Sequence, residues 1–331
     1  MKRVWVLLLV VLGIAAGYGF TGSNVPRAEL SFQGAPATAE QLGEMLFFEP
    51  MISANRDLSC ASCHIPAHGF ADTVAFSTGV GGRLGKRNAP SCANMSERPY
   101  FFFDGRAATL EDQVRFPIED ENEMGLPIAE AVARLNSDPK YVQYFNAIYR
   151  QAPSEANLKS AIAAFERTLE TSSTPFDRYM KGNDSAISLS AQRGRELFMS
   201  DKAKCFDCHF SPDFTGDEFR NIGLYDGVKY TDEGRFVITK DSADLGKFKV
   251  PGLRNVAVTA PYMHNGMFRT LREVIDYYDD PYKSVARPVN IDTLLLQPLH
   301  LTEQEKVDLE NFMRTLTDDR FANSSRASLK R

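Results

Sequence analysis

Apolar residues recur every three or four positions along much of the chain, which is the spacing of one buried face of a helix. In the segment 270–278, for example, Leu271, Val274, Ile275 and Tyr278 share one face. Few stretches alternate apolar and polar residues as strands do. The pattern therefore predicts a mainly α-helical protein, with its clearest helical segments at residues 126–135, 140–150, 157–170, 270–278 and 302–316.

Threonines mark the beginning of two of these helices and of a further short one after residue 38. Each is followed three residues later by Gln or Glu, the pattern of a capping box, in which two side chains satisfy free backbone N–H groups. The pairs are Thr38 with Gln41, Thr270 with Glu273, and Thr302 with Glu305. We expect a helix to start after each threonine.

A short motif occurs twice in the chain. The pattern Q-x-G-x-x-L-F fills residues 41–47 and again 192–198, and each copy leads into Cys-x-x-Cys-His, at 60–64 and 205–209. The spacing of the copies is that of an internal repeat at domain scale. We expect a short amphipathic helix before each cysteine motif.

The length of 331 residues suggests about two domains at roughly 150 residues each. The polar stretch 181–190 is the best boundary between them. We therefore predict an N-terminal domain over 21–180 and a C-terminal domain over 181–331.

Residues 1–20 have the pattern of an export signal, because Lys2 and Arg3 precede an apolar run that ends in small residues. An uncleaved membrane anchor is the alternative. Either way we expect the protein in the periplasm, with no membrane span once the signal is cleaved. Losing Lys2 and Arg3 changes the net charge from −5 to −7, which argues against a nucleic-acid partner and allows a basic redox partner.

The two cysteine motifs carry the chemistry. Two thiols can bond the vinyl groups of a haem while the adjacent imidazole binds its iron. We predict two covalently bound c-type haems, since a zinc site or a redox dithiol does not account for the motif occurring twice. The fifth cysteine, Cys92, is expected to be a small buried side chain. The residues that would hold the haems are Cys60, Cys63 and His64, and Cys205, Cys208 and His209.

The chain also resembles the bacterial di-haem cytochrome c peroxidases, and within them the MauG-like subgroup. Beyond the haem motifs, the resemblance is carried by KRNAPS, FFFDGRAATLEDQ, PIEDENEMG and FKVPGLRNVAVTAPYMHNG at 86–91, 101–113, 117–125 and 248–266. It implies two cytochrome c-like helical domains, each with one haem, and a calcium ion between them. It also implies that the N-terminal haem is the one that reacts with peroxide.

The resemblance implies an open N-terminal haem. Classical members carry a histidine in the loop before the Asn-Ala-Pro motif, and the matching segment 77–90 contains none. Glu123 matches the family's acid–base glutamate, and Gln113 matches a glutamine that lines the same site. From composition alone, Glu123 is one carboxylate of a solvated acidic run, so its catalytic role depends on the resemblance.

At the C-terminal haem the resemblance implies a tyrosine ligand. Tyr278 stands 17 residues after Pro261, where classical members have methionine. A phenolate favours ferric iron, whereas a thioether favours ferrous iron. Tyr277, Met263 and Met267 are rival ligands, and Tyr278 also fits the apolar face of its helix as a core residue.

Two further sites follow from the resemblance. Asn88 and the carbonyls of Thr259 and Pro261 would hold calcium, which prefers oxygen ligands; the alternative is that Asn88 caps a turn. Phe103 stands where the family usually has a tryptophan that relays charge between the haems. Phenylalanine is much harder to oxidise, and Tyr100 is a conceivable substitute.

Three functions are compatible with these residues. The first is reduction of hydrogen peroxide with electrons from a small periplasmic redox protein, a c-type cytochrome or a cupredoxin. The second is a MauG-like, peroxide-dependent oxidase that modifies side chains of a partner protein. The third is a non-enzymatic di-haem electron carrier, which would have no use for Glu123.

Overall fold

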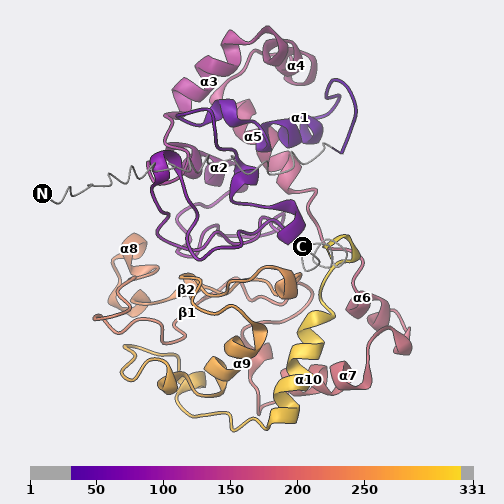
Figure 1. The fold of residues 1–331 in the computed structure, drawn as a ribbon, viewed down its shortest axis with the longest axis vertical. Coiled ribbons are helices and arrows are strands. Elements are labelled where there is room, and N and C mark those ends of the chain that lie inside the picture. The colour runs from indigo at the N-terminus through magenta and orange to yellow at the C-terminus, as the bar shows by residue number, and fades with distance from the viewer. Residues whose placement is uncertain (1–30, 322–331) are drawn as a thin grey trace, which may run out of the picture.

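The computed structural model describes residues 31–321, which form a mainly helical protein of two lobes (Figure 1). This confirms the predicted helical class. Within residues 31–321, no helix is long and apolar enough to cross a membrane. The predicted export segment, residues 1–20, lies outside the described residues. The first lobe contains α1 (Ala39–Phe47), α2 (Leu110–Glu119), α3 (Ile128–Ser137), α4 (Pro139–Tyr149) and α5 (Glu155–Glu166).

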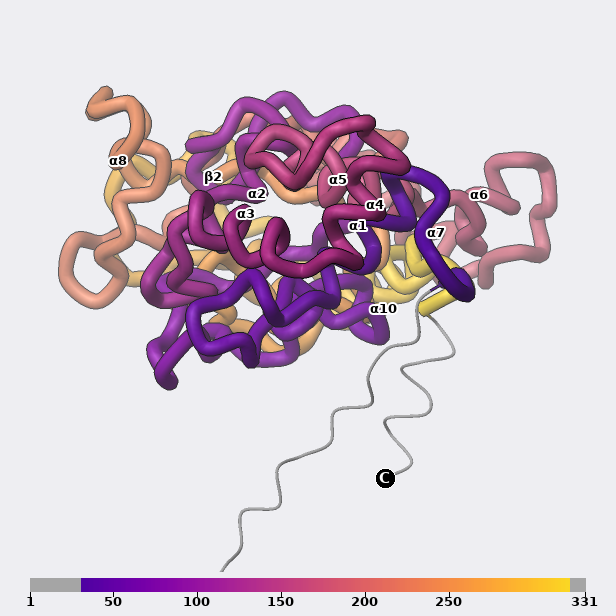
Figure 2. Tube along the Cα trace, turned by 90° about the horizontal axis from the view of Figure 1, so that it is seen from above, coloured from indigo at the N-terminus to yellow at the C-terminus, as the bar shows by residue number. Residues whose placement is uncertain are grey.

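The second lobe carries the remaining elements. Its strands β1 (Phe219–Arg220) and β2 (Phe248–Lys249) pair antiparallel, with Phe219 opposite Lys249. Viewed from above, α6 and α8 lie at opposite ends of the molecule (Figure 2). The helices are α6 (Pro175–Met180), α7 (Leu189–Phe198), α8 (Phe236–Thr239), α9 (Leu271–Asp279) and α10 (Glu303–Arg314).

The glycine of the repeated motif has the same structural role in both lobes. A Cβ at Gly43 of α1 would lie 1.8 Å from the carbonyl oxygen of Ala161 in α5. A Cβ at Gly194 of α7 would lie 1.9 Å from the carbonyl oxygen of Asp308 in α10. Only glycine lets the two backbones approach so closely, so the repeat encodes a helix crossing beside each cysteine motif.

The predicted capping box is complete at two of the three threonines. Capping boxes form at Thr270 and at Thr302. Thr38 accepts from the Gln41 N–H, but the Gln41 side chain accepts from Ala37 instead of returning to Thr38. The first box is therefore only half formed, although α1 still begins at Ala39.

The lobes meet across a layer of charges and backbone hydrogen bonds. Arg87 of the first lobe pairs with Asp232 of the second through Nε and Nη2, at 2.6 and 2.7 Å. The Lys249 N–H donates to the Phe103 carbonyl at 2.7 Å. These contacts hold residues 86–106 against the strands of the second lobe.

Candidate active site

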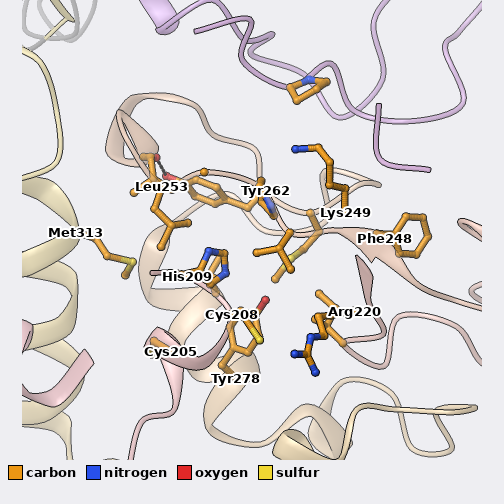
Figure 3. Close-up of a pocket in the computed structure, with 18 of the residues that line it drawn as sticks. Cys205, Cys208, His209, Arg220, Phe248, Lys249, Leu253, Tyr262, Tyr278 and Met313 are labelled. Atoms are coloured by element: carbon orange, nitrogen blue, oxygen red, sulfur yellow. Dashed lines mark hydrogen bonds between the residues drawn. The ribbon is translucent and has the colours of Figure 1, made fainter. Parts of the chain in front are cut away.

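The second Cys-x-x-Cys-His motif opens onto a cavity of about 310 Å³ (Figure 3). The motif forms one 3₁₀ turn, Cys205–Asp207, in which the His209 N–H donates to the Cys205 carbonyl at 2.9 Å. Both cysteines, His209 and Tyr278 line the cavity together. The structure therefore assembles two thiols, an imidazole and a phenol around one mostly apolar space.

The His209 ring is fixed in one tautomer. Its Nδ1 lies 2.9 Å from the Phe214 carbonyl and must carry the proton, which leaves Nε2 without one. Burial lowers the pKa of His209, so the ring is neutral. A neutral imidazole whose far nitrogen is anchored to the backbone is the usual arrangement of a metal ligand.

The first motif repeats this geometry. Cys60–Ser62 is a 3₁₀ turn, and the His64 N–H donates to the Cys60 carbonyl at 2.9 Å. The His64 Nδ1 lies 3.1 Å from the Phe70 carbonyl, and burial lowers the pKa of His64. Both lobes thus present a histidine anchored through Nδ1 next to two cysteines that form no disulfide. Haem is the group that this donor set fits.

Among the rival ligands, Tyr278 and Met263 line the cavity. Tyr277 is 2% exposed, and its hydroxyl donates to the Ile222 carbonyl at 2.5 Å, so it is committed elsewhere. Met267 packs in the hydrophobic cluster around Tyr277 and does not line the cavity. Burial raises the pKa of Tyr278, so its oxygen would ionise only on a cation such as ferric iron.

Glu123 lies in a tight turn that folds back on the end of α2. Its N–H donates to the Asp120 carbonyl at 2.9 Å, and the next N–H, of Met124, donates to Pro117 at 3.0 Å. Burial is the main cause that raises the pKa of Glu123, with a smaller contribution from Asp120. The Glu123 carboxyl makes no hydrogen bond or ion pair with another residue of the described chain.

The Glu123 carboxyl is coupled electrostatically to the first cysteine motif. Burial is the main cause that raises the pKa of the Cys60 and Cys63 thiols, and nearby acids add to it: Glu166 at Cys60, Asp72 at Cys63, and, to a smaller degree, Glu123 at both. Gln113 lies ten residues earlier, on α2, and is partly buried. The structure records no hydrogen bond between Gln113 and Glu123.

The three predicted calcium ligands, Asn88 of the first lobe and Thr259 and Pro261 of the second, all line the cavity. The Asn88 Nδ2 donates a hydrogen bond to the Val74 carbonyl at 3.0 Å. The Asn88 Oδ1 accepts no hydrogen bond from another described residue, so it is available as a ligand. One amide oxygen and two carbonyl oxygens are donors that fit calcium.

The junction contains an aromatic group where the family has tryptophan. Phe103 lines the cavity and meets the His264 ring edge-on, with centroids 6.5 Å apart. His264 in turn stacks on Phe248 at 3.8 Å. Tyr100 is 38% exposed and packs on Phe219, so it does not occupy the place of Phe103.

Among the buried acids of the described residues, one that influences cysteines of the first lobe was not predicted from the sequence. Glu166, the last residue of α5, is 5% exposed, and its charge raises the pKa of Cys60 and Cys92. The sequence signal was present, because Glu166 continues the apolar face formed by Leu158 and Ile162. Cys92 is 8% exposed, in agreement with its expected burial.

Comparisons with known proteins identify the family. Residues 37–185 match the family model of di-haem cytochrome c peroxidase. The chain is 36% identical over 285 residues to methylamine utilization protein MauG of Methylorubrum extorquens, which covers 85% of this chain and 79% of MauG. It is 39% identical over 247 residues to cytochrome c peroxidase Ccp of Escherichia coli, spanning 72% of this chain and 53% of that relative.

A solved structure has the same fold. It is described as a MauG-like protein associated with microbial copper homeostasis, is 34% identical, and superposes with a TM-score of 0.79 over 89% of this chain and 95% of its own. The fold is therefore that of a di-haem oxidoreductase. The chain belongs to the di-haem cytochrome c peroxidase family, and the predicted resemblance is confirmed.

Proposed function

We propose that this protein reduces hydrogen peroxide at a haem of the N-terminal lobe. The overall reaction is H₂O₂ + 2 H⁺ + 2 e⁻ → 2 H₂O. The electrons come from a small periplasmic redox protein, a c-type cytochrome or a cupredoxin, by way of a second haem. The observation that carries the proposal is the Glu123 carboxyl, which is partly buried, makes no hydrogen bond or ion pair with another described residue, and influences the thiols of both Cys60 and Cys63 through its charge.

The chain would hold each haem in the same way. Cys60 and Cys63, and in the second lobe Cys205 and Cys208, would form thioethers to the vinyl groups. His64 and His209 would bind iron through Nε2, since their Nδ1 atoms are tied to the backbone. Haem supplies the site at which the O–O bond is cleaved.

Glu123 is assigned the proton transfer. Its carboxylate accepts the proton of the peroxide oxygen nearer to the iron and returns it to the departing oxygen, which leaves as water. Burial raises the pKa of Glu123, which makes a proton-carrying state accessible during turnover. Gln113 would orient the peroxide from α2.

The segment 77–90 supplies no histidine, so the proposed N-terminal haem has one protein ligand and is ready without prior reduction. In the second lobe, His209 and Tyr278, which line the same cavity, would hold the other haem. A calcium ion at Asn88, Thr259 and Pro261 would tie the two lobes together.

A MauG-like oxidase acting on a partner protein is the second candidate. Tyr278 favours it, because a phenolate ligand stabilises oxidised iron. Phe103 opposes it, because phenylalanine does not relay oxidising equivalents readily. Phe103 at the lobe junction therefore favours peroxide reduction over oxidation of a partner protein.

Steady-state kinetics tests the choice. The oxidised protein is given hydrogen peroxide and a reduced c-type cytochrome, and cytochrome oxidation is followed by absorbance. Sustained turnover, lost in Glu123→Gln by roughly 100-fold or more, is the expected result. Rapid consumption of peroxide with no oxidation of either a cytochrome or a cupredoxin would favour the oxidase.

A further inference from the structure

A glycine-rich loop is fastened to the turn that carries Glu123. Residues 77–85 form a small hairpin, with Thr78 bridged to Leu84 and the Gly79 N–H donating to the Arg83 carbonyl at 2.7 Å. The Val80 N–H donates outward to the Glu123 carbonyl, also at 2.7 Å. The hairpin therefore holds the main chain of the candidate acid–base residue directly.

Two more contacts secure the same turn. The Arg83 Nη1 donates to the Glu121 carbonyl at 2.9 Å. The Val80 side chain fills the space over Gly125, where an added Cβ would lie 2.7 Å away. The hairpin thus contacts the turn near its beginning, middle and end.

Gly79 makes this contact possible. A Cβ at Gly79 would lie 1.9 Å from the carbonyl oxygen of Asn122 and 2.8 Å from that of Glu123. The φ of Gly79 is −92°, a conformation open to any residue. Glycine is therefore needed here for the close approach of two main chains and not for the backbone conformation.

We propose that Gly79 is a positioning residue for peroxide cleavage, because it lets the 77–85 hairpin fix the Glu123 turn in its working place. This inference rests on the proposed role of Glu123. With alanine at position 79, the two main chains must separate by about 1 Å to relieve the Asn122 contact. A misplacement of ~1 Å in a catalytic group can cost roughly 100-fold in rate.

Gly85 provides the matched control. It lies in the same hairpin, but its added Cβ would meet no atom closer than 3.7 Å, an ordinary contact. The experiment measures the second-order rate constant for hydrogen peroxide by stopped-flow absorbance of the oxidised holoprotein. Haem content and unfolding in urea are measured for every variant, so that a loss of fold is seen separately.

The variants form a double-mutant cycle of Gly79→Ala with Glu123→Gln. We expect Gly79→Ala to lower the rate constant by at least ~10-fold, and the same change to have less than ~3-fold effect when Glu123 is already Gln. The pH inflection of the rate should move to lower pH in Gly79→Ala, because the loosened turn exposes the carboxyl to water. Gly85→Ala should react like the wild type.

Val80→Pro serves as a second variant if Gly79→Ala folds poorly. It removes the N–H that holds Glu123 and alters the Val80 side chain over Gly125, at a helix start where proline is tolerated, and it should lower the rate in the same Glu123-dependent way. A wild-type rate in Gly79→Ala, or an equal loss in both Glu123 backgrounds, would overturn the inference. A wild-type rate in Glu123→Gln would instead overturn the proposed function.

Discussion

Replacing Glu166 should change the pH dependence of stability. This carboxyl is 5% exposed and has no hydrogen bond or ion pair with another described residue. Burial raises its pKa from an ordinary value of 4.5 to about 8, offset in part by Arg167. The folded protein therefore binds a proton that the unfolded chain releases between about pH 4.5 and pH 8.

The sign and size follow from this difference. Because the pKa of Glu166 is raised in the folded state, its contribution to stability is complete below pH 4.5 and is lost as the pH rises toward 8. Each pH unit between these two values lowers the free energy of unfolding by about 1.36 kcal/mol. Between pH 5.5 and pH 7.5 the free energy of unfolding of the wild type should thus fall by about 3 kcal/mol. The free energy of unfolding of Glu166→Gln should not show this fall.

Urea unfolding of the holoprotein, followed by circular dichroism at both pH values, measures this difference. Glu155→Gln is the control, since Glu155 lies on the same helix but is 42% exposed in its side chain. The free energies of unfolding of this control should follow the wild type. If the wild type and Glu166→Gln lose stability equally between pH 5.5 and pH 7.5, the carboxyl is ionised when buried and the reasoning is refuted.

Three further changes test other parts of the account. Gly43→Ala should cost about 1–3 kcal/mol of unfolding free energy through overpacking of α1 on α5, measured by urea unfolding with Gly85→Ala as control. Tyr278→Met should raise the reduction potential of the C-terminal haem, because a thioether favours ferrous iron, as read by spectroelectrochemistry; an unchanged potential would exclude Tyr278 as ligand. Asn88→Ala should weaken calcium binding in titration calorimetry, and equal affinity would remove Asn88 from the proposed ligands.

The sequence predicted the local features of the fold well. Caps at Thr270 and Thr302 and the apolar periodicity located α9 and α10, because these signals act within a few residues. The helix predicted over 157–170 instead spans Glu155–Glu166. The segment of α2 was noted only as a family motif, since its polar first turn and internal Pro117 hide the helical pattern.

Contacts between segments far apart in the sequence could be identified only from the structure. Gly43 and Gly194 are recognisable in the sequence as the glycine of the repeated motif. The backbones that they contact, at Ala161 and Asp308, lie more than 100 residues away along the chain. The hold of the 77–85 hairpin on Glu123 likewise joins segments separated by about 40 residues. Spacing rules cannot predict which main chains meet, so close approach appears only when the chain is folded.

The electron paramagnetic resonance spectrum of the fully oxidised holoprotein tests the central claim most directly. We predict one high-spin ferric signal, from an N-terminal haem with His64 as its sole protein ligand, and one low-spin signal from the haem held by His209 and Tyr278. Two low-spin signals would contradict it, because the N-terminal haem would then have a sixth ligand and could not bind peroxide without first losing it.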